Sequence, residues 1–363
     1  MKNVRLFCCF IMIFLFSSIS NITFCEESKD GVSKFLDSYV VNELNDGIIY
    51  SNLNTNNITK YDYSMVDSIT IDFYDFYNNL DNLDDLYLLT NLCSLNIEFS
   101  EFSLNYNKEL NLDKSVLDKI DIDFNKFEKL NKITIDSPSL DYNFEFIKTA
   151  KNIKTLNIYA LNSDNLEFLS SFSQLRNLSI CNTNISNLDF LKNLTEIRSL
   201  VLQSNPSLND ISKLDDLINL HSLLFDDCSQ LSSSDFSSLN LNKMYIFELS
   251  NMAGLNDINF VNNYNKLYTF RLHDITIDDL YFVEKNTTIR DFSIYNSYVN
   301  SYTSFMCLKK NNTILRTLLN EEFEPDENCS NYKNLSTLLA NNFVFKNYKV
   351  YFKNSNTILL KNM

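Results

Sequence analysis

The sequence contains very little glycine and proline. Only 3 of its 363 residues are glycine, 3 are proline and none is tryptophan. So little glycine almost excludes flexible Gly/Ser linkers and the glycine-lined loops that cradle phosphate groups. Histidine is equally scarce, with 2 residues, and the chain has no H-E-x-x-H or G-x-S-x-G motif. The common sequence signatures of metalloproteases, serine hydrolases and nucleotide-binding enzymes are therefore missing.

Positive charge is in the minority. The chain carries 31 Lys and Arg against 46 Asp and Glu, a formal net charge of −15. Nucleic acids and anionic membrane surfaces repel a protein of this charge, so both are unexpected as partners. Acidic pairs can serve as general acid and base or bind calcium, but no spacing in this sequence fixes such a site. We expect neither a metal nor another cofactor.

The N-terminus has the pattern of an export signal. A short basic region, Lys2 and Arg5, precedes the apolar run from Leu6 to Ile19. A run of this length suits a signal peptide and is short for a membrane span, which predicts a signal over residues 1–25 with cleavage after Ser20 or Cys25. An uncleaved N-terminal anchor is the alternative. No second run of this length follows, so we expect a secreted, extracellular protein with no stable membrane insertion once the signal is removed.

The cysteines support an exported chain without a zinc site. Five follow the signal: Cys93, Cys181, Cys228, Cys307 and Cys329. An odd number cannot all pair within one chain, and no C-x-x-C or Cys/His spacing suggests zinc. Cys181 and Cys228 lie within repeats and are expected to be buried. Cys307 and Cys329 lie together beyond the regular repeats and are the pair expected to form a disulfide.

What the sequence has in abundance is a repeat. The pattern L-x-x-L-x-L begins at intervals of 22, 22, 23, 24, 23 and 22 residues, at Ile153, Leu175, Ile197, Leu220, Met244, Leu267 and Ile289. Leucine-rich repeats have periods of about 20 to 29 residues, each a short strand with a helical or irregular return. The apolar residues three and five positions after each start lie on one side of that strand because strand side chains alternate.

A second apolar column marks the return half of each repeat. Phenylalanine recurs at the matching position as Phe168, Phe190, Phe236, Phe260 and Phe282. One repeat cannot bury its apolar edge alone, so neighbouring repeats must stack. The predicted fold class is therefore α/β: a leucine-rich-repeat solenoid with a curved parallel sheet on the concave side, short helical or irregular returns on the convex side, and terminal caps.

The ends of the solenoid are predicted to differ from its middle. Residues 30–47 have helical apolar spacing, which predicts a helical cap within residues 26–64. The repeats occupy residues 65–300, with less regular strands ending in Ile71, Ile97 and Ile135. The wide gap before the last of these predicts a longer outer helix through Leu117 to Phe127, or alternatively an extra strand over 117–122. Residues 301–363 are predicted to hold a degenerate last repeat and a C-terminal cap, with a strand near its end.

Residues 184–205, NISNLDFLKNLTEIRSLVLQSN, resemble the 22-residue repeats of internalin-type leucine-rich proteins. The resemblance covers about residues 65–300 and implies a secreted or surface-displayed domain that grips a protein on its concave strand face. The chain departs from that family at the position of the asparagine that joins successive coils. Only Asn205 matches there, while Cys228 and Thr183 are tolerable substitutes, so the coils are expected to be less uniform.

The candidate binding residues are those that alternate with the buried positions of the strands. Most are polar, and the densest cluster combines acids with one arginine and one histidine on four successive coils. Strands stack about 4.8 Å apart, so these groups can contact one partner. The predicted partner-binding residues on the concave face are Tyr159, Gln203, Asp226, Asp227, Glu248, Arg271, His273, Asp274, Asp291 and Tyr295.

We predict from these observations a secreted protein-recognition module without enzymatic activity. Its partner is expected to be a protein with a basic patch, and a host protein is among the candidates. A structural or self-assembly role is the alternative hypothesis. A carboxylate-based hydrolase is a distant third.

Overall fold

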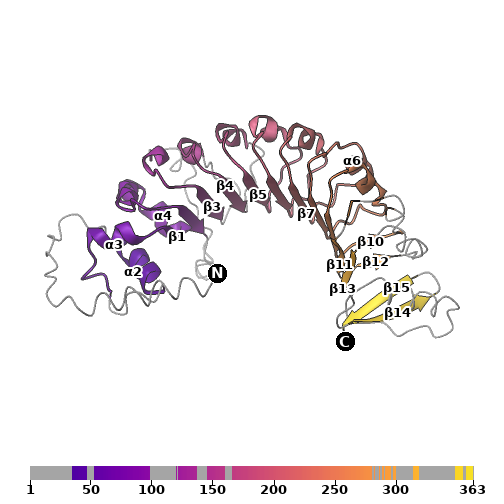
Figure 1. Ribbon diagram of the computed structural model, residues 1–363. Helices are drawn as coiled ribbons and strands as arrows, with labels where there is room; N and C mark the ends of the chain where they lie inside the picture. The colour runs from indigo at the N-terminus through magenta and orange to yellow at the C-terminus, as the bar shows by residue number, and fades with distance from the viewer. Residues whose placement is uncertain are drawn as a thin grey trace.

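The polypeptide forms an arch whose inner side is a sheet and whose outer side carries short helices (Figure 1). The computed structural model describes residues 35–46, 53–98, 120, 122–136, 145–159, 166–279, 282, 286, 288–289, 291–295, 297–299, 314–318, 348–354 and 357–362. This architecture confirms the predicted leucine-rich-repeat solenoid.

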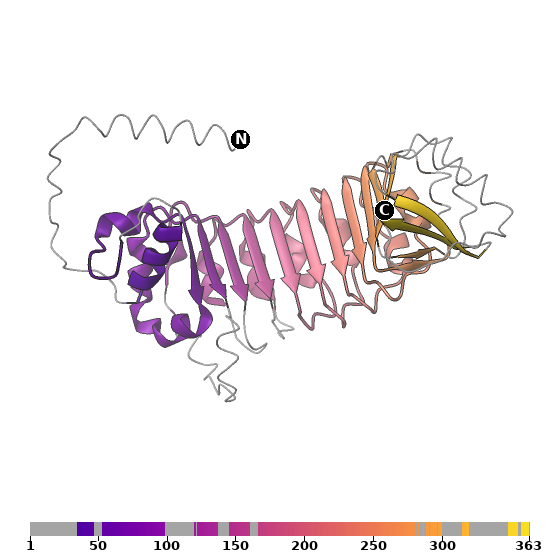
Figure 2. The same cartoon turned by 90° about the horizontal axis from the view of Figure 1, so that it is seen from below.

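The inner side is one parallel sheet of eleven strands in the order β1 to β9, β11 and β13. Figure 2 shows the strands side by side along the length of the molecule. Each regular strand starts two residues after the first apolar residue of its repeat, as predicted. The strands are β1 (Ser68–Asp72), β2 (Ser94–Glu98), β3 (Lys132–Asp136), β4 (Thr155–Tyr159), β5 (Asn177–Cys181), β6 (Ser199–Gln203), β7 (Ser222–Asp226), β8 (Ile246–Ser250), β9 (Thr269–His273), β11 (Asp291–Tyr295) and β13 (Ile314–Leu318).

Alternation along each strand separates core from surface. In β6, Leu200 and Leu202 are buried, while Ser199, Val201 and Gln203 remain partly or fully exposed. The pairing register keeps these positions aligned from coil to coil, with Leu178 opposite Leu200 and Leu200 opposite Leu223. A continuous apolar core therefore runs under the whole sheet, as stacking of incomplete repeats requires.

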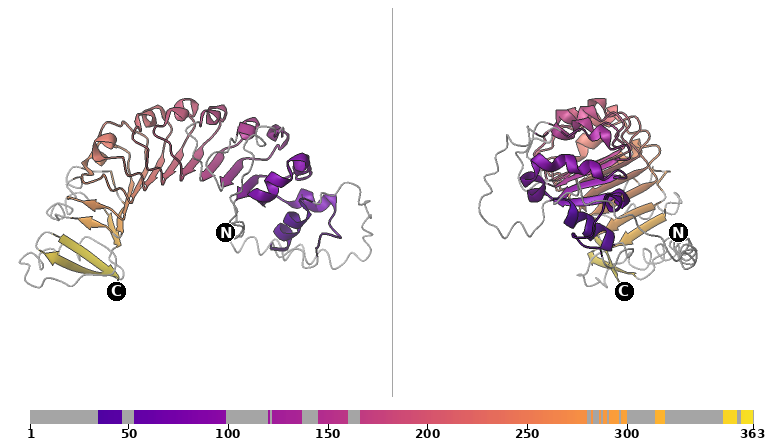
Figure 3. Two further views of the ribbon diagram at one scale, coloured as in Figure 1. Left: turned by 180° about the vertical axis from the view of Figure 1, so that it is seen from behind. Right: turned by 90° about the vertical axis from the view of Figure 1, so that its left-hand side faces the viewer.

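The outer returns are mostly single 3-10 turns. The left view of Figure 3 shows these turns along the convex side, and the right view, along the molecule from one end, shows them opposite the sheet. Of the predicted phenylalanine column, Phe236, Phe260 and Phe282 are buried, and Phe168 and Phe190 pack against the core while partly exposed. The returns are α4 (Phe73–Asn78), η1 (Leu80–Leu88), η3 (Phe124–Lys126), η4 (Glu145–Thr149), η5 (Glu167–Ser171), η6 (Asp189–Asn193), η7 (Ser212–Asp216), α6 (Ser233–Ser237) and η8 (Asn259–Asn263).

Where the structure describes the wide gap between β2 and β3, at residues 120 and 122–131, it does not contain the predicted long helix. Ile120 and residues 122–123 are not helical, and only the single turn η3 follows them. Phe124 and Phe127 are both buried, because this turn directs both side chains into the core. Their spacing of three residues is also the spacing of neighbours on one face of a helix. The alternative of an extra sheet strand is also wrong, since β2 pairs directly with β3. Leu117 lies outside the described residues.

Among the described residues, two helices precede the first strand. α2 (Asp37–Asp46) confirms the predicted helix from Asp37 onward, and α3 (Lys60–Met65) was not predicted. α2 packs against β1, where the Tyr39 hydroxyl donates to Asp75 Oδ2 at 2.5 Å and accepts from the Asp72 amide at 3.2 Å. Within the described part of the chain, no helix combines the length and apolar character of a bilayer-spanning segment.

The C-terminal end adds strands beyond the regular repeats. β13 extends the main sheet and places Leu315 opposite Phe292, as expected for a degenerate last repeat. β14 (Tyr348–Asn354) confirms the strand predicted near the C-terminus and pairs antiparallel with β15 (Thr357–Asn362). The short strands β10 (Thr276–Ile277) and β12 (Tyr298–Val299) form a separate pair. The predicted disulfide partners Cys307 and Cys329 lie outside the described residues.

Buried polar bonds join successive coils at the position that asparagine holds in internalin-type repeats. Asn205 donates from Nδ2 to Ile180 O at 3.0 Å and accepts at Oδ1 from Thr183 N at 3.1 Å. Cys228 takes the same place one coil later and donates its thiol to Leu202 O at 3.6 Å. Ser297 accepts from the Ile275 amide at 3.1 Å. Asn205 therefore joins two coils as the resemblance implies, Cys228 substitutes for asparagine as expected, and Ser297 also joins two coils.

The turn after each strand compensates for the lack of glycine. The first residue beyond five successive strands has a positive φ, near 50°, and these residues are Asn182, Ser204, Asp227, Asn251 and Asp274. Asn and Asp tolerate this conformation better than most non-glycine residues. Four of their amides donate to the last strand residue of the next coil, as in Asn182 N to Gln203 O at 2.9 Å. Gly254 meets a different need, because a Cβ there would lie 2.3 Å from Leu231 O.

Candidate binding face

From β1 to β9, the concave face is built by the first, third and fifth residue of each strand. These residues form three rows that cross the sheet, because all strands are parallel and in register. The fifth-position row contains Tyr159, Cys181, Gln203, Asp226 and His273. The third-position row contains Glu248 opposite Arg271. Most of the predicted binding residues thus lie on one continuous face.

The predicted acidic cluster is partly neutralised within the protein. Glu248 lies between two nitrogen-bearing side chains: its Oε2 is 3.5 Å from Arg271 Nη1, and its Oε1 is 3.5 Å from His273 Nε2. All three side chains are partly exposed, so each pair contributes modestly to stability. Glu248 therefore presents a charge-paired surface rather than a free carboxylate.

Asp226 has a different setting. Its Oδ2 accepts from Gln203 Nε2 at 3.0 Å, and Gln203 Oε1 in turn accepts from the Cys181 thiol at 3.8 Å. These contacts link three neighbouring coils in one row. No cation in the described part of the chain lies within ion-pair distance of Asp226 or Asp227. The negative charge that this end of the face presents therefore belongs mainly to Asp226 and to the turn residue beside it.

Three of the remaining predicted residues lie at the margins of the face. Asp227 and Asp274 are the left-handed turn residues directly beyond β7 and β9, so they extend the carboxyl edge of the sheet. Asp291 is the first residue of β11, opposite Thr269. Four residues along a strand span about 13 Å, so Asp291 lies at the opposite edge from Asp226. Tyr295 ends β11, but its side chain lies outside what the structure describes.

A second acidic stretch was missed by the repeat analysis. Asp72, Glu98 and Asp136 end β1, β2 and β3, and so continue the fifth-position row toward the N-terminal end. Asp136 lies opposite Tyr159. Burial, reinforced by the nearby charge of Glu98, raises the pKa of Asp136 above its ordinary value. The signal was present in the sequence, because each of these acids follows the second apolar residue of its strand.

Burial also acts on two more titratable groups of this row. It raises the pKa of Tyr159, with the neighbouring Cys181 adding to the effect, and it raises the pKa of Cys181 itself. Burial raises the pKa of Cys228 to about 12, so this free cysteine stays a thiol. No group of three or more His, Cys, Asp or Glu side chains among the described residues is arranged to hold a metal ion.

Known structures share this architecture. An internalin from Listeria monocytogenes aligns with a TM-score of 0.52 and 15% identity over 84% of this chain and 79% of its own. A TLR13–ssRNA13 complex aligns with a TM-score of 0.49 and 16% identity over 69% of this chain and 36% of that one. No protein-family model and no curated protein sequence matches the chain. At such low identity the likeness extends to the leucine-rich-repeat fold alone.

Proposed function

We propose that this leucine-rich-repeat protein is a secreted recognition module that binds a protein partner on its concave strand face. The size of that face is the observation that carries the proposal. Eleven strands about 4.8 Å apart span about 48 Å, and five residues of strand span about 16 Å. The resulting area, roughly 800 Å², equals what one partner contributes to a stable protein–protein interface.

The charge of the face supports a partner with a basic patch. Its carboxyl edge carries Asp72, Glu98 and Asp136 at one end and Asp226 and Asp227 further along. Complementary charge of this kind mainly accelerates association. Tyr159, which lies half-buried between the two acidic stretches, is the proposed aromatic anchor, because buried tyrosines carry a large share of binding energy at interfaces.

Export is part of the same proposal. Residues 1–25 would direct secretion, residues 26–64 and 301–363 would cap the solenoid, and a host protein remains among the possible partners. Mass spectrometry of the mature N-terminus tests the first point. A chain that begins after Ser20 or Cys25 supports export, and a retained Met1 contradicts it.

A differential capture experiment tests the binding face. The wild-type protein, the inner variant Asp226→Asn/Asp227→Asn and the outer variant Asp189→Asn/Asp216→Asn are immobilised and exposed to extracellular fluid. Both variants remove two charges, but only the inner pair lies at the concave face, since Asp189 and Asp216 belong to η6 and η7. We expect that one protein from the fluid binds to the wild type and to the outer variant, and that the inner variant retains much less of it. Equal retention on all three would contradict the proposal.

Sedimentation of the purified wild-type protein tests the alternative of self-assembly. A chain that stacks on itself sediments as oligomers at low concentration, whereas a recognition module for another protein sediments as a monomer.

The variant Tyr159→Ala tests the proposed aromatic anchor separately from the charged residues. We expect it to raise the dissociation rate of the captured partner with little change in the association rate.

A further inference from the structure

The residue directly before each strand forms a row along the amino edge of the sheet. From β4 to β9 this edge row consists of Lys154, Arg176, Arg198, His221, Tyr245 and Tyr268. Backbone hydrogen bonds hold its members in line, among them Arg176 N to Lys154 O at 2.9 Å and Arg198 N to Arg176 O at 2.7 Å. The side chains of all six are exposed.

The edge row concentrates positive charge in an acidic protein. The four-residue segments that end in these six residues contain six Lys or Arg and a single acid, Glu196, whereas the whole chain has 31 bases and 46 acids. Among the described residues, no carboxylate lies within ion-pair distance of Lys154, Arg176 or Arg198. These three cations therefore face solvent on consecutive coils, about 4.8 Å apart.

The far end of the edge row is aromatic. The rings of Tyr245 and Tyr268 stack with centroids 4.9 Å apart and planes 6° from parallel. Tyr245 is 44% exposed and Tyr268 is 40% exposed. A stacked aromatic pair that served only to pack the core would be buried. The pair offers a flat apolar platform beside the row of cations.

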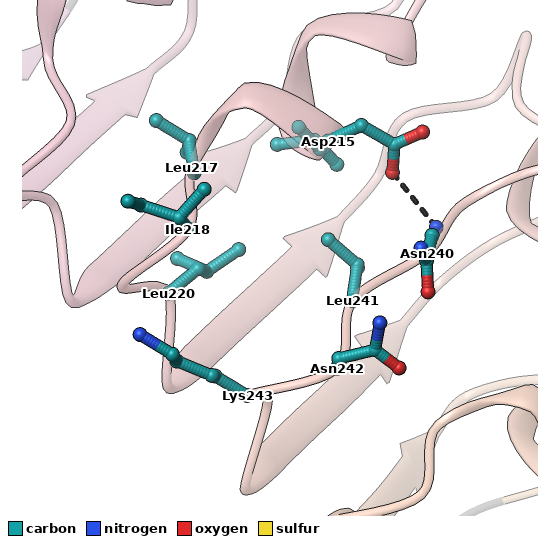
Figure 4. A pocket seen from close by; sticks show the side chains of 9 residues that line it. Asp215, Leu217, Ile218, Leu220, Asn240, Leu241, Asn242 and Lys243 are labelled. Atoms are coloured by element: carbon teal, nitrogen blue, oxygen red, sulfur yellow. Dashed lines mark hydrogen bonds between the residues drawn. The ribbon is translucent and has the colours of Figure 1, made fainter.

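A cavity of about 260 Å³ opens between the coils of β7 and β8, and two of its lining residues, Leu220 and Lys243, lie within two positions of the edge-row residues His221 and Tyr245 in the chain. Figure 4 shows its lining, in which Leu220 and Leu241 approach from neighbouring coils and Lys243 and Asn242 lie at one rim. Ile218, also in the lining, is 62% exposed. The opposite rim is fixed by the Asn240 amide, which donates to Asp215 Oδ1 at 2.7 Å. The cavity is slightly smaller than typical small-molecule sites, and it combines apolar walls with a few polar groups as they do.

We propose that the edge row binds a linear anionic polysaccharide. Sulfate or carboxylate groups of the polymer contact Lys154, Arg176 and Arg198, and a sugar ring lies against Tyr245 and Tyr268 with the cavity beside it. A nucleic acid fits less well, because the tyrosine rings stack on each other and leave no gap for a base. This site is separate from the proposed protein-binding function and uses the opposite edge of the sheet.

Fluorescence anisotropy with the full secreted chain tests the proposal. The probes are a labelled heparin oligosaccharide, which is sulfated, and a labelled polygalacturonate oligosaccharide, which carries carboxylates only. At about 50 mM salt we expect Arg176→Glu/Arg198→Glu to weaken binding of at least one glycan tenfold or more, and to flatten its salt dependence by about two charges. The preferred probe identifies the anionic group. Tyr245→Ala/Tyr268→Ala should weaken binding several-fold without changing the salt slope.

The matched control is Lys192→Glu/Lys213→Glu, which makes the same change in net charge on the outer turns η6 and η7. We expect its affinity to stay within twofold of wild type. Three outcomes would overturn the proposal: neither glycan binds at this salt concentration, the control loses as much affinity as the edge variant, or a single-stranded oligonucleotide binds more tightly than both glycans. The thermal unfolding midpoint of each variant establishes that the fold is intact.

Discussion

At the scale of single residues, Asp136 shows a position where charge opposes folding. Its raised pKa means that the folded state binds the proton more tightly than the unfolded state does. The free energy of unfolding therefore falls as pH rises through the interval between the ordinary and the raised pKa. An acid kept at such a position is consistent with a role in binding, because binding sites often cost stability.

We accordingly predict that Asp136→Asn stabilises the protein by about 0.5 kcal/mol at neutral pH, the scale of a cross-strand charge pair. Below about pH 3, where the carboxyl is protonated in both states, the advantage should vanish. Urea denaturation at several pH values measures the difference. A variant that is less stable than wild type at neutral pH would show that Asp136 forms a stabilising contact instead.

Asn205 is the residue on which adjacent coils depend most. Asn205→Ala leaves Ile180 O and Thr183 N without their buried partner, and each such loss costs about 1–3 kcal/mol. We predict a total loss near 3 kcal/mol for this variant, and about 1 kcal/mol for Cys228→Ala, whose thiol is a weak donor. Chemical denaturation of both variants gives the comparison. Equal losses would mean that the amide bonds contribute nothing specific.

The sequence predicted which residues lie on the concave face better than it predicted their contacts there. Alternation alone placed Asp226, Glu248 and Arg271 on one face, because the strand period is fixed. It could not show that Glu248 is paired with Arg271 and His273, since those contacts depend on side-chain conformation across coils. Nor did it show that Asp227 serves a left-handed turn, although a small polar residue recurs at that place after each strand from β5 to β9.

At the scale of elements, the strands were predictable and the irregular return was not. The position of every main-sheet strand from β1 to β11 followed from apolar residues at a fixed spacing, whereas the short strand β10 was not predicted. The return between β2 and β3 was misjudged because two phenylalanines of a single 3-10 turn, Phe124 and Phe127, have the same spacing as neighbours on a long helix. Short returns carry too few residues for periodicity to identify the helix type.

The strand phase can be tested within one element. Leu200 in β6 and Leu178 in β5 are fully buried, whereas Ser179 is partly exposed on the concave face. Leu200→Asp or Leu178→Asp would bury an unpaired carboxylate and should cost several kcal/mol, enough to unfold much of the sheet. Ser179→Asp should cost less than about 1 kcal/mol. Circular dichroism during thermal unfolding distinguishes them, and equal destabilisation would disprove the assigned phase.

The C-terminal element provides a chemical prediction. A disulfide between Cys307 and Cys329 would close a loop of about two dozen residues and contribute roughly 3 kcal/mol by loop closure. In an exported chain such a bond persists. We predict that peptide mapping of the secreted protein under non-reducing conditions finds the two joined, with Cys181 and Cys228 as free thiols. Detection of Cys307 and Cys329 both as free thiols would remove the prediction.

At the scale of the whole molecule, the parallel sheet sorts charge by edge. All strands point the same way, so the residues before the strands gather at one edge and those that end them gather at the other. The first edge carries Lys154, Arg176 and Arg198, and the second carries Asp136, Asp226 and Asp227. Net charge alone suggested one acidic surface, because a total cannot reveal how the fold distributes its charges.

The dependence of the association rate on salt tests the concave binding face most directly. Stopped-flow or biosensor kinetics with the captured partner would compare wild type, Asp226→Asn/Asp227→Asn and Asp189→Asn/Asp216→Asn from about 50 mM to about 500 mM salt. The account predicts that the inner variant associates about tenfold more slowly at low salt and that its rate changes little with salt, while the outer variant matches wild type. An outer variant that slows association as much as the inner one would contradict it.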